Sequence, residues 1–183
     1  WRVQNWSNHP VAAQRQVLQD LVSAGQYTEF GKKYHFEKLF TLKEFKKKVP
    51  IHEYDNIKSY INRMVEGEDN VLWNTPVKWF AKSSGTTSDK SKFIPISDES
   101  LADNHFKAAK DVLTNYYNNF PGSDLLTGKS LVVGGSHQLS KMNEEIQFGD
   151  LSAVLMQNSP FWGQWIRTPE LSVALLDEWE NKI

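Results

Sequence analysis

Residues 78–96, KWFAKSSGTTSDKSKFIPI, place one polar loop between two short apolar runs, and the fold follows from this arrangement. The runs at 78–82 and 93–96 predict strands, and Pro95 predicts that the second strand lies at a sheet edge or ends there. The loop at 83–92 is rich in hydroxyl residues and carries Lys90 and Lys92. Backbone N–H groups, hydroxyls and ammonium groups in such a loop can converge on a phosphate. A polar hairpin without a ligand remains the alternative, because Ser, Thr, Gly and Asp are also ordinary turn residues.

The loop matches neither of the two most common phosphate-binding motifs. A Walker A loop needs a second glycine followed by Lys and Ser or Thr, and it opens a helix, whereas this loop holds only Gly85 and leads into an apolar extended run. The dinucleotide fingerprint needs three spaced glycines, which are absent here.

The loop resembles the first nucleotide-binding motif of the adenylate-forming superfamily. That motif corresponds here to Ser-Ser-Gly-Thr-Thr at 83–87, four variable residues, Lys92, and an apolar pair before Pro95. Within the superfamily the chain is most similar to the auxin-responsive (Gretchen Hagen) acyl-acid amido synthetases. Further similar segments are Phe30-Gly31-Lys32-Lys33-Tyr34, Val49-Pro50-Ile51 and Tyr54, in the family's order and at about its spacing. The similarity covers most of residues 10–183. Asp89 departs from the glycine of many plant members, and its carboxylate would repel phosphate unless it points away or helps to hold a metal ion.

The resemblance implies ATP and Mg²⁺ as cofactors, a carboxylic acid and an amino acid as partners, and the following roles. The phosphates of ATP would be wrapped by the loop residues Ser83, Ser84, Gly85, Thr86 and Thr87 together with Lys92. Lys92 and Thr86 would be catalytic, with Lys92 neutralising charge on the departing pyrophosphate.

The helix after the loop is implied to line the pocket for the acyl acid. The residues expected there are Asn104, His105, Ala108 and Val112, with Met156 and Phe161 as further candidates. The alternative for the apolar ones is ordinary core packing. No basic residue of this helix matches the arginine that some plant members place on the acid's carboxylate, so the identity of the acid is not implied.

Composition sets limits on the class of protein. At 183 residues, with 39% hydrophobic and 13% aromatic residues, the chain can form one folded domain. A net charge of −1 gives no overall field that favours nucleic acid or an anionic membrane. The absence of cysteine excludes disulfides and cysteine catalysis and fits a reducing cytoplasm. No apolar stretch approaches the roughly 20 residues of a membrane-spanning helix.

The spacing of hydrophobic residues and the positions of helix-capping and helix-breaking residues predict helices at the start of the chain, followed by mixed strands and helices. Asp55 is expected to cap one of the helices, and the Thr41-x-x-Glu44 pattern predicts a capping box for another. The expected helices are 10–24, a short turn from Thr28, 42–48, one from Asp55 to Val65, 98–118 and 172–183. The expected strands are 78–82, 93–96, 129–133 and strand-like structure over 146–157.

These elements predict an α/β fold, namely the N-terminal part of the large domain of an adenylate-forming enzyme. The expected organisation of this single partial domain is a helical region at 1–76, the strand–loop–strand unit at 77–97 and an α/β region at 98–183. The chain begins at Trp1 and ends within a predicted helix, and the family's downstream nucleotide motifs are not recognisable. We therefore expect an incomplete N-terminal portion of a larger enzyme, inactive alone.

The sequence favours this function over several others. A hydrolase is disfavoured because Gly134-Gly135-Ser136-His137-Gln138 lacks the final glycine of a nucleophile elbow. No histidine has a partner at metal-ligand spacing, so no metal site is predicted. The lysines at 43–48 are most simply a solvated helix face. An acyl-CoA-type ligase of the same superfamily and a non-catalytic interaction module remain as alternatives.

Overall fold

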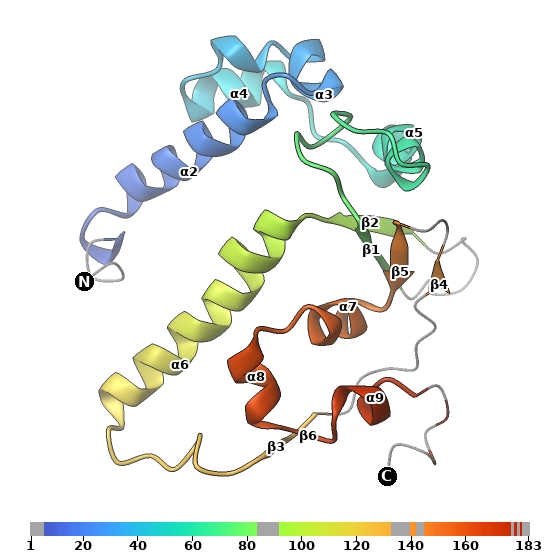
Figure 1. Ribbon diagram of the computed structural model, residues 1–183. Coiled ribbons are helices and arrows are strands. Elements are labelled where there is room, and N and C mark those ends of the chain that lie inside the picture. Colours follow the sequence, from blue (N-terminus) through green and yellow to red (C-terminus); the bar gives the residue numbers. More distant parts are fainter. Residues whose placement is uncertain are drawn as a thin grey trace. The chain divides into compact units, whose positions relative to one another are not determined.

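The computed structural model of the protein describes residues 6–83, 92–132, 140–141, 145–176, 178 and 180. The chain forms two compact units, residues 1–76 and residues 77–183 (Figure 1), and each is described by itself. Across the described residues, none of the helices has both the length and the apolar character needed to cross a membrane.

The first unit is helical, as its hydrophobic spacing predicts. Its elements are α2 (Pro10–Gly25), α3 (Glu29–Lys33), the 3-10 turn η1 (Phe36–Lys38), α4 (Leu42–Lys48) and α5 (Tyr54–Val65).

Two capping arrangements set the starts of helices in this unit. The predicted capping box is confirmed, because the Glu44 backbone N–H donates to Thr41 Oγ1 at 3.2 Å and the Thr41 N–H donates to Glu44 Oε2 at 2.9 Å. The expected cap of α5 at Asp55 is wrong. Glu53 is the N-cap residue, and its backbone N–H donates to Asn56 Oδ1 at 3.0 Å, so the helix starts earlier than Asp55.

The end of α2 and the start of α3 are joined by a fully buried threonine. Thr28 Oγ1 donates to the carbonyl of Gly25 at 2.7 Å and accepts from the backbone N–H of Gly31 at 2.9 Å. A Cβ on Gly31 would lie 2.0 Å from the Gly25 carbonyl oxygen. The close approach of these two backbones therefore requires glycine at position 31.

Three charged side chains link α3, α5 and the turn after α5. Arg63 Nη2 lies 2.6 Å from Glu29 Oε2, and Arg63 Nε donates to Glu68 Oε2 at 2.6 Å. Hydrogen bonds from Arg63 hold the pKa of the Glu29 and Glu68 carboxyls below their usual values. Both carboxylates are exposed, so solvent screens the pairs.

The second unit is built on a small mixed sheet (Figure 1). Its strand order is β2-β1-β5-β4, where β1 pairs antiparallel with β2 and parallel with β5, and β5 pairs antiparallel with β4. The edge position predicted from Pro95 for β2 is confirmed. The bounds are β1 (Trp79–Lys82), β2 (Phe93–Ile96), β4 (Ser140–Lys141) and β5 (Gln147–Gly149).

A second, two-stranded sheet pairs β3 (Ser130–Leu131) in parallel with β6 (Arg167–Thr168). The expected strand at 129–133 is therefore shorter than predicted, with its last residue outside the described residues. A strand this short is held by pairing with β6 rather than by its own sequence.

The helices of the second unit depart most from expectation. Their bounds are the π segment η2 (Ser100–Phe106), α6 (Lys107–Asn119), α7 (Leu151–Gln157), α8 (Phe161–Trp165) and α9 (Leu171–Ala174). The helix expected at 98–118 is confirmed in position, but its first turns, Ser100–Phe106, are π-helical rather than α-helical.

Two sequence-based predictions in this part of the chain are wrong. Residues 151–157 are helical rather than strand-like, because Ala153, Val154 and Met156 all face the core from one side of a helix. The helix expected at 172–183 ends at Ala174, where Leu175 is the C-cap, and residues 177, 179 and 181–183 lie outside the described residues.

The core of the second unit joins the sheet to the helices on either side of it in sequence. Ala81 of β1, Ile96 of β2, Leu101 of the π segment and Val154 of α7 form one buried cluster. Trp79, Phe106 and Leu155 pack against this cluster. Burial of these side chains holds β1 and β2, which flank the polar loop, against the helices that follow in sequence.

We predict that Gly31→Ala lowers the free energy of unfolding by about 1–3 kcal/mol, because the new methyl group would overlap a backbone oxygen. Urea denaturation measures this change. Gly128→Ala is the control, since a Cβ at Gly128 meets nothing within 4 Å, and we expect it to stay within about 0.5 kcal/mol of the parent. Equal effects of the two substitutions would contradict the close approach at Gly31.

We also predict a pH dependence that runs through Arg63. The pKa values of Glu29 and Glu68 are lower in the folded protein than their ordinary value of 4.5. Their pairing with Arg63 therefore stabilises the fold above about pH 4.5 and is lost as the pH falls through the lowered pKa values. Arg63→Gln should flatten this acid-side loss of stability, measured by urea denaturation across pH 3–7, whereas Arg15→Gln on α2 should leave the pH profile unchanged.

Candidate functional site

The base of the polar loop is closed by backbone pairing that continues from the strands. The antiparallel ladder pairs Lys82 with Phe93, and the next residues are also joined. The Ser83 backbone N–H donates to the carbonyl of Lys92 at 3.0 Å, and the Lys92 N–H donates to Ser83 Oγ at 3.3 Å. The two ends of the predicted phosphate loop are thus held together, and its eight inner residues, 84–91, lie outside the described residues.

A pocket of about 450 Å³ opens beside this loop base. Because β1 and β5 pair in parallel, the carboxyl ends of both strands lie at the same end of the sheet. There β1 runs into the loop and β5 runs into α7. Ligands of open α/β sheets bind outside the carboxyl ends of parallel strands. The pocket is lined by Ala81, Lys82, Ser83, Ile94, Ile96, Asp150, Leu151 and Ser152.

The pocket combines an apolar wall with a few polar groups, as small-molecule sites do. Ser83 supplies a hydroxyl, Lys82 a cation and Asp150 a carboxylate. Among the described residues, Lys82 and Asp150 form no ion pair with each other. A phosphate could accept from Ser83 and Lys82, and a hydrated cation could bind at Asp150.

Of the polar residues that line this pocket, Ser83 was predicted, whereas Lys82, Asp150 and Ser152 were not. Asp150 is the N-cap residue of α7, where its backbone carbonyl accepts from the N–H groups of Ala153 and Val154, and Ser152 follows in the first turn. The available signal was an acidic residue directly after a short strand, at Gly149-Asp150. That signal was hidden because residues 151–157 were interpreted as more strand.

The predicted phosphate-binding residues are only partly described. Ser83 and Lys92 lie together at the loop base. The predicted residues Ser84, Gly85, Thr86 and Thr87 lie outside the described residues, as does Asp89.

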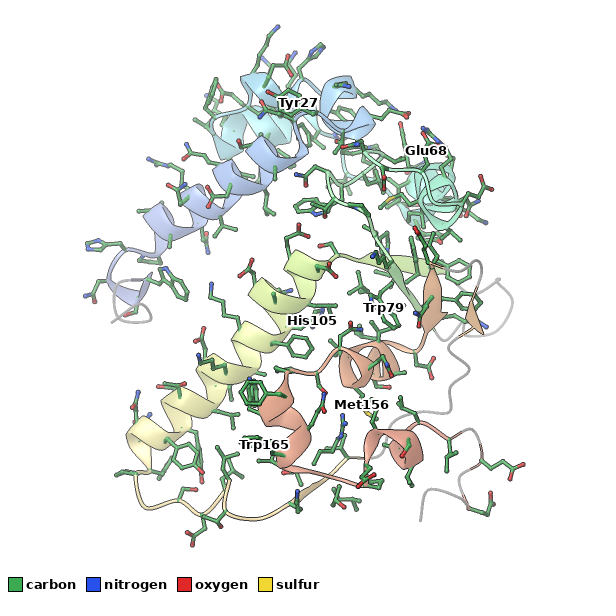
Figure 2. All side chains as sticks on the ribbon, viewed as in Figure 1. Tyr27, Glu68, Trp79, His105, Met156 and Trp165 are labelled. Atoms are coloured by element: carbon green, nitrogen blue, oxygen red, sulfur yellow. The ribbon has the colours of Figure 1, made fainter. Side chains whose placement is uncertain are left out.

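The residues predicted for the acid pocket lie on the π segment and α6. Asn104, Ala108 and Val112 are exposed and are spaced by four residues, which places them along one side of the helix. His105 is half-buried (Figure 2). None of the four lines the pocket beside the loop base, so their role stays a prediction.

The two further candidates for the acid pocket differ in exposure. Met156 lies on α7 with only 7% of its surface exposed, as expected of a core residue, whereas Phe161 on α8 is 67% exposed. Figure 2 labels Met156 and Trp165, which mark α7 and the end of α8.

The described part of the chain contains no group of three His, Cys, Asp or Glu side chains arranged to hold a metal ion. Among the described residues that line this pocket, Asp150 supplies the carboxylate that a cation could use, together with the phosphates of a ligand. This donor set suits Mg²⁺, which usually keeps several waters and binds through one or two carboxylates and substrate phosphates.

Comparisons with known proteins identify relatives of the chain. A 29% identity over 100 residues relates it to indole-3-acetic acid-amido synthetase GH3.2 of Arabidopsis thaliana, covering 54% of this chain and 18% of that protein. A 32% identity over 89 residues relates it to the 4-substituted benzoates-glutamate ligase GH3.12 of the same plant, covering 48% of this chain and 15% of that protein. The chain thus spans less than a fifth of the length of these two curated relatives.

Solved structures support the fold. The GH3.15 acyl acid amido synthetase superposes with a TM-score of 0.73 at 20% identity, covering 96% of this chain and 30% of that one. The AtGH3.15 acyl acid amido synthetase in complex with 2,4-DB superposes with a TM-score of 0.67 at 26% identity, covering 79% of this chain and 25% of that one. The expected α/β fold, with a helical start followed by mixed strands and helices, is confirmed.

A sequence model described as the GH3 family N-terminal domain matches residues 2–182, nearly the whole chain. This match confirms the resemblance that the loop at 83–92 and the segments before it indicate. The chain belongs to the GH3 family, of which it carries the N-terminal domain.

Proposed function

We propose that the protein is an ATP-dependent acyl-acid amido synthetase. The observation that carries this proposal is the loop base at Ser83 and Lys92, closed by two hydrogen bonds and adjoining a pocket at the carboxyl ends of two parallel strands, in a GH3 family chain. The names of the relatives, an indole-3-acetic acid-amido synthetase and a benzoates-glutamate ligase, support an acid and an amino acid as substrates.

The reaction has two steps. A carboxylate oxygen of the acid attacks the α-phosphorus of ATP, the bond to pyrophosphate breaks, and an acyl-adenylate forms. The amine of an amino acid then attacks the acyl carbon, loses a proton, and displaces AMP. Neither step needs a covalent enzyme intermediate, so the protein contributes positioning and charge stabilisation.

In this proposal the loop residues hold the phosphates. Ser83 lies at the loop base with its hydroxyl beside the pocket, and Ser84, Gly85, Thr86 and Thr87 continue from it along the chain. Lys92 would stabilise the negative charge that develops on pyrophosphate, and Thr86 would donate to the same phosphates. Mg²⁺ would neutralise part of the phosphate charge, with Asp150 as the pocket carboxylate able to hold its water shell.

The acid would bind along the helix that follows β2. Asn104, Ala108 and Val112 share one exposed side of this helix, and His105 adjoins them. An exposed apolar side chain such as Val112, at 68% exposure, is available for a substrate to cover.

We predict that Lys92→Ala in the full-length protein lowers acid-dependent ATP–pyrophosphate exchange by about 10²–10³-fold, the usual effect of removing one donor to developing charge. The control is Lys110→Ala, which removes the same charge from an exposed position on α6. Exchange by the Lys92→Ala variant at the rate of the parent would contradict the phosphate role. Exchange without amide formation, but with thioester formation from coenzyme A, would contradict the amide step.

A second prediction tests the acid-binding helix. Ala108→Trp should raise the KM for the acid by about tenfold or more while leaving the KM for ATP unchanged, because the indole would occupy the proposed acid site. Ala109→Trp is the matched control, since Ala109 is also exposed but points about 100° away around the helix. Equal effects of both substitutions on the acid would show that this side of the helix does not bind it.

A further inference from the structure

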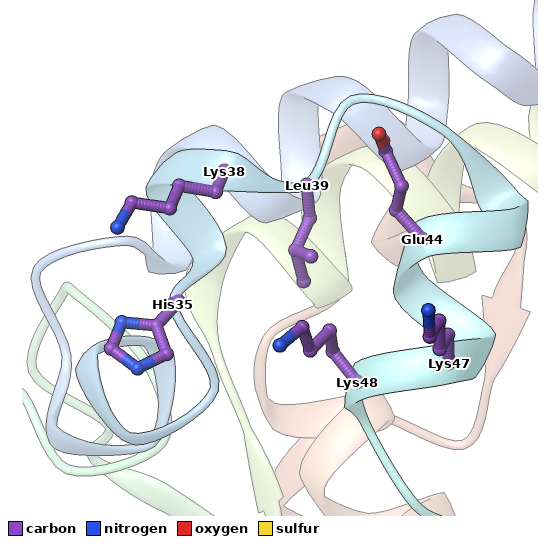
Figure 3. A pocket seen from close by; sticks show the side chains of 6 residues that line it. All are labelled: His35, Lys38, Leu39, Glu44, Lys47 and Lys48. Atoms are coloured by element: carbon purple, nitrogen blue, oxygen red, sulfur yellow. The ribbon is translucent and has the colours of Figure 1, made fainter.

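The first unit carries a second, separate pocket, which is basic. It has a volume of about 410 Å³ and lies between the turn η1 and α4 (Figure 3). We call it the lysine pocket, and it is lined by His35, Lys38, Leu39, Glu44, Lys47 and Lys48.

Two elements supply the lining, so the pocket is more than one face of a helix. Lys47 and Lys48 come from the last turn of α4, whereas His35 and Lys38 come from the η1 region. His35 has a left-handed backbone with φ of 56° and ψ of 50°, which is uncommon outside glycine. This conformation turns the chain into η1, which is why Lys38 and Leu39 come to lie beside α4.

The floor of the pocket is apolar. Leu39 is 5% exposed and lies between the two basic elements. In Figure 3 the side chain of Lys48 extends below Leu39 toward the side on which His35 lies. Because lysine stems are themselves aliphatic, Leu39 and these stems form an apolar surface with ammonium groups at its rim.

The carboxylate of Glu44 does not neutralise these lysines by pairing with them. Its Oε2 accepts from the Phe40 N–H at 3.0 Å and from the Thr41 N–H and Oγ1, each at 2.9 Å. The hydrogen bonds from Thr41 and Phe40 lower the pKa of Glu44, so the group stays charged and is held at the start of the helix.

The other nearby carboxylate is also engaged. Glu37 Oε1 lies 3.4 Å from His35 Nδ1 and 4.0 Å from Lys38 Nζ. Within the described residues, Lys47 and Lys48 form no ion pair. Two unpaired cations therefore face a concave surface, where a field is focused rather than dispersed.

A structural explanation accounts for part of this arrangement. Lysines in the last turn of a helix interact favourably with its carbonyl end. That effect explains why α4 ends in lysines, but it does not explain why His35 and Lys38 of another element line the same pocket. Convergence from two elements is what distinguishes a binding site from a solvated helix face.

We propose that the lysine pocket binds a small soluble molecule that carries a phosphate group, at a site separate from the loop at 83–92. Lysine binds phosphate as a point charge, and the pocket volume lies in the range of small-molecule sites. Lys47 and Lys48 bind the phosphate, and Leu39 with the lysine stems contacts the apolar part of the ligand. This site goes beyond the proposed reaction and does not depend on it.

Pyridoxal 5′-phosphate is a suitable probe, because it reports which lysine it meets. Its aldehyde condenses with a lysine amine and loses water, and added borohydride reduces the imine to a stable secondary amine. Peptide mapping of the full-length protein then counts labels at each lysine, so binding at the loop does not interfere. We expect Lys47 and Lys48 to be labelled about tenfold faster than Lys43 and Lys46, which lie on the same helix outside the pocket.

Two controls separate phosphate recognition from general lysine reactivity. Pyridoxal without the phosphate should label the four lysines of α4 equally, and inorganic phosphate should protect Lys47 and Lys48 only. Equal labelling of all four lysines by pyridoxal 5′-phosphate, or labelling that phosphate does not protect, would overturn the proposal.

A pair of variants tests the site without the reduction step, so that imine formation stays reversible. Lys47→Gln/Lys48→Gln should weaken binding of pyridoxal 5′-phosphate, measured by fluorescence without borohydride, at least about tenfold relative to Lys43→Gln/Lys46→Gln, which removes the same charge from the same helix. Sedimentation with phosphatidylserine vesicles covers the lipid alternative. If the two double variants weaken vesicle binding equally, the lysines of α4 form a flat basic surface that binds membranes, and the proposed phosphate pocket is wrong.

Discussion

The site in the second unit depends on the pairing of β1 on both of its edges. Antiparallel hydrogen bonds to β2 bring Ser83 beside Lys92. Parallel pairing with β5 brings the start of α7 to the same end of the sheet. Phe80, which is fully buried, and Ala81 fix this strand in the core. Phe80 and Ala81 are adjacent and therefore point to opposite faces of the sheet, so a slip of β1 by one residue would move each side chain to the other face and would break the pairing of Ser83 with Lys92. The pocket beside the loop is therefore a product of strand register.

Much of the fold could be predicted because the deciding interactions are local. The Thr41-x-x-Glu44 pattern gives the start of α4 from side chains three residues apart. Pro95 cannot donate a ladder hydrogen bond, so the edge position of β2 follows from one residue. The loop motif at 83–92, with the segments before it, likewise identified the family, because a motif is a local pattern. Ser83 and Lys92 were predicted as site residues for the same reason, and the structure brings the two together at the loop base.

The remaining features depend on contacts between residues far apart in sequence. Residues 151–157 form a short apolar run that fits a strand or a buried helix equally well, and only packing of Val154 against Ala81 and Ile96 selects the helix. Asp150 could not be assigned to the site while that helix was interpreted as a strand. Similarly, β3 and β6 have two residues each, and each is a strand only because it pairs with the other, which lies far away in sequence. Position 31 needs glycine because of a carbonyl at position 25, which sequence spacing does not reveal.

The π-helical turns at Ser100–Phe106 affect how the sequence of this chain should be aligned with those of its relatives. Each hydrogen bond in a π segment spans five residues rather than four, so the segment holds an extra residue compared with a regular helix. A related helix that is regular from its first turn should therefore align with a one-residue gap inside this helix. An alignment that moves this gap into the loop after Asn119 would rotate every position of α6 by about 100° and assign exposed positions to the wrong face.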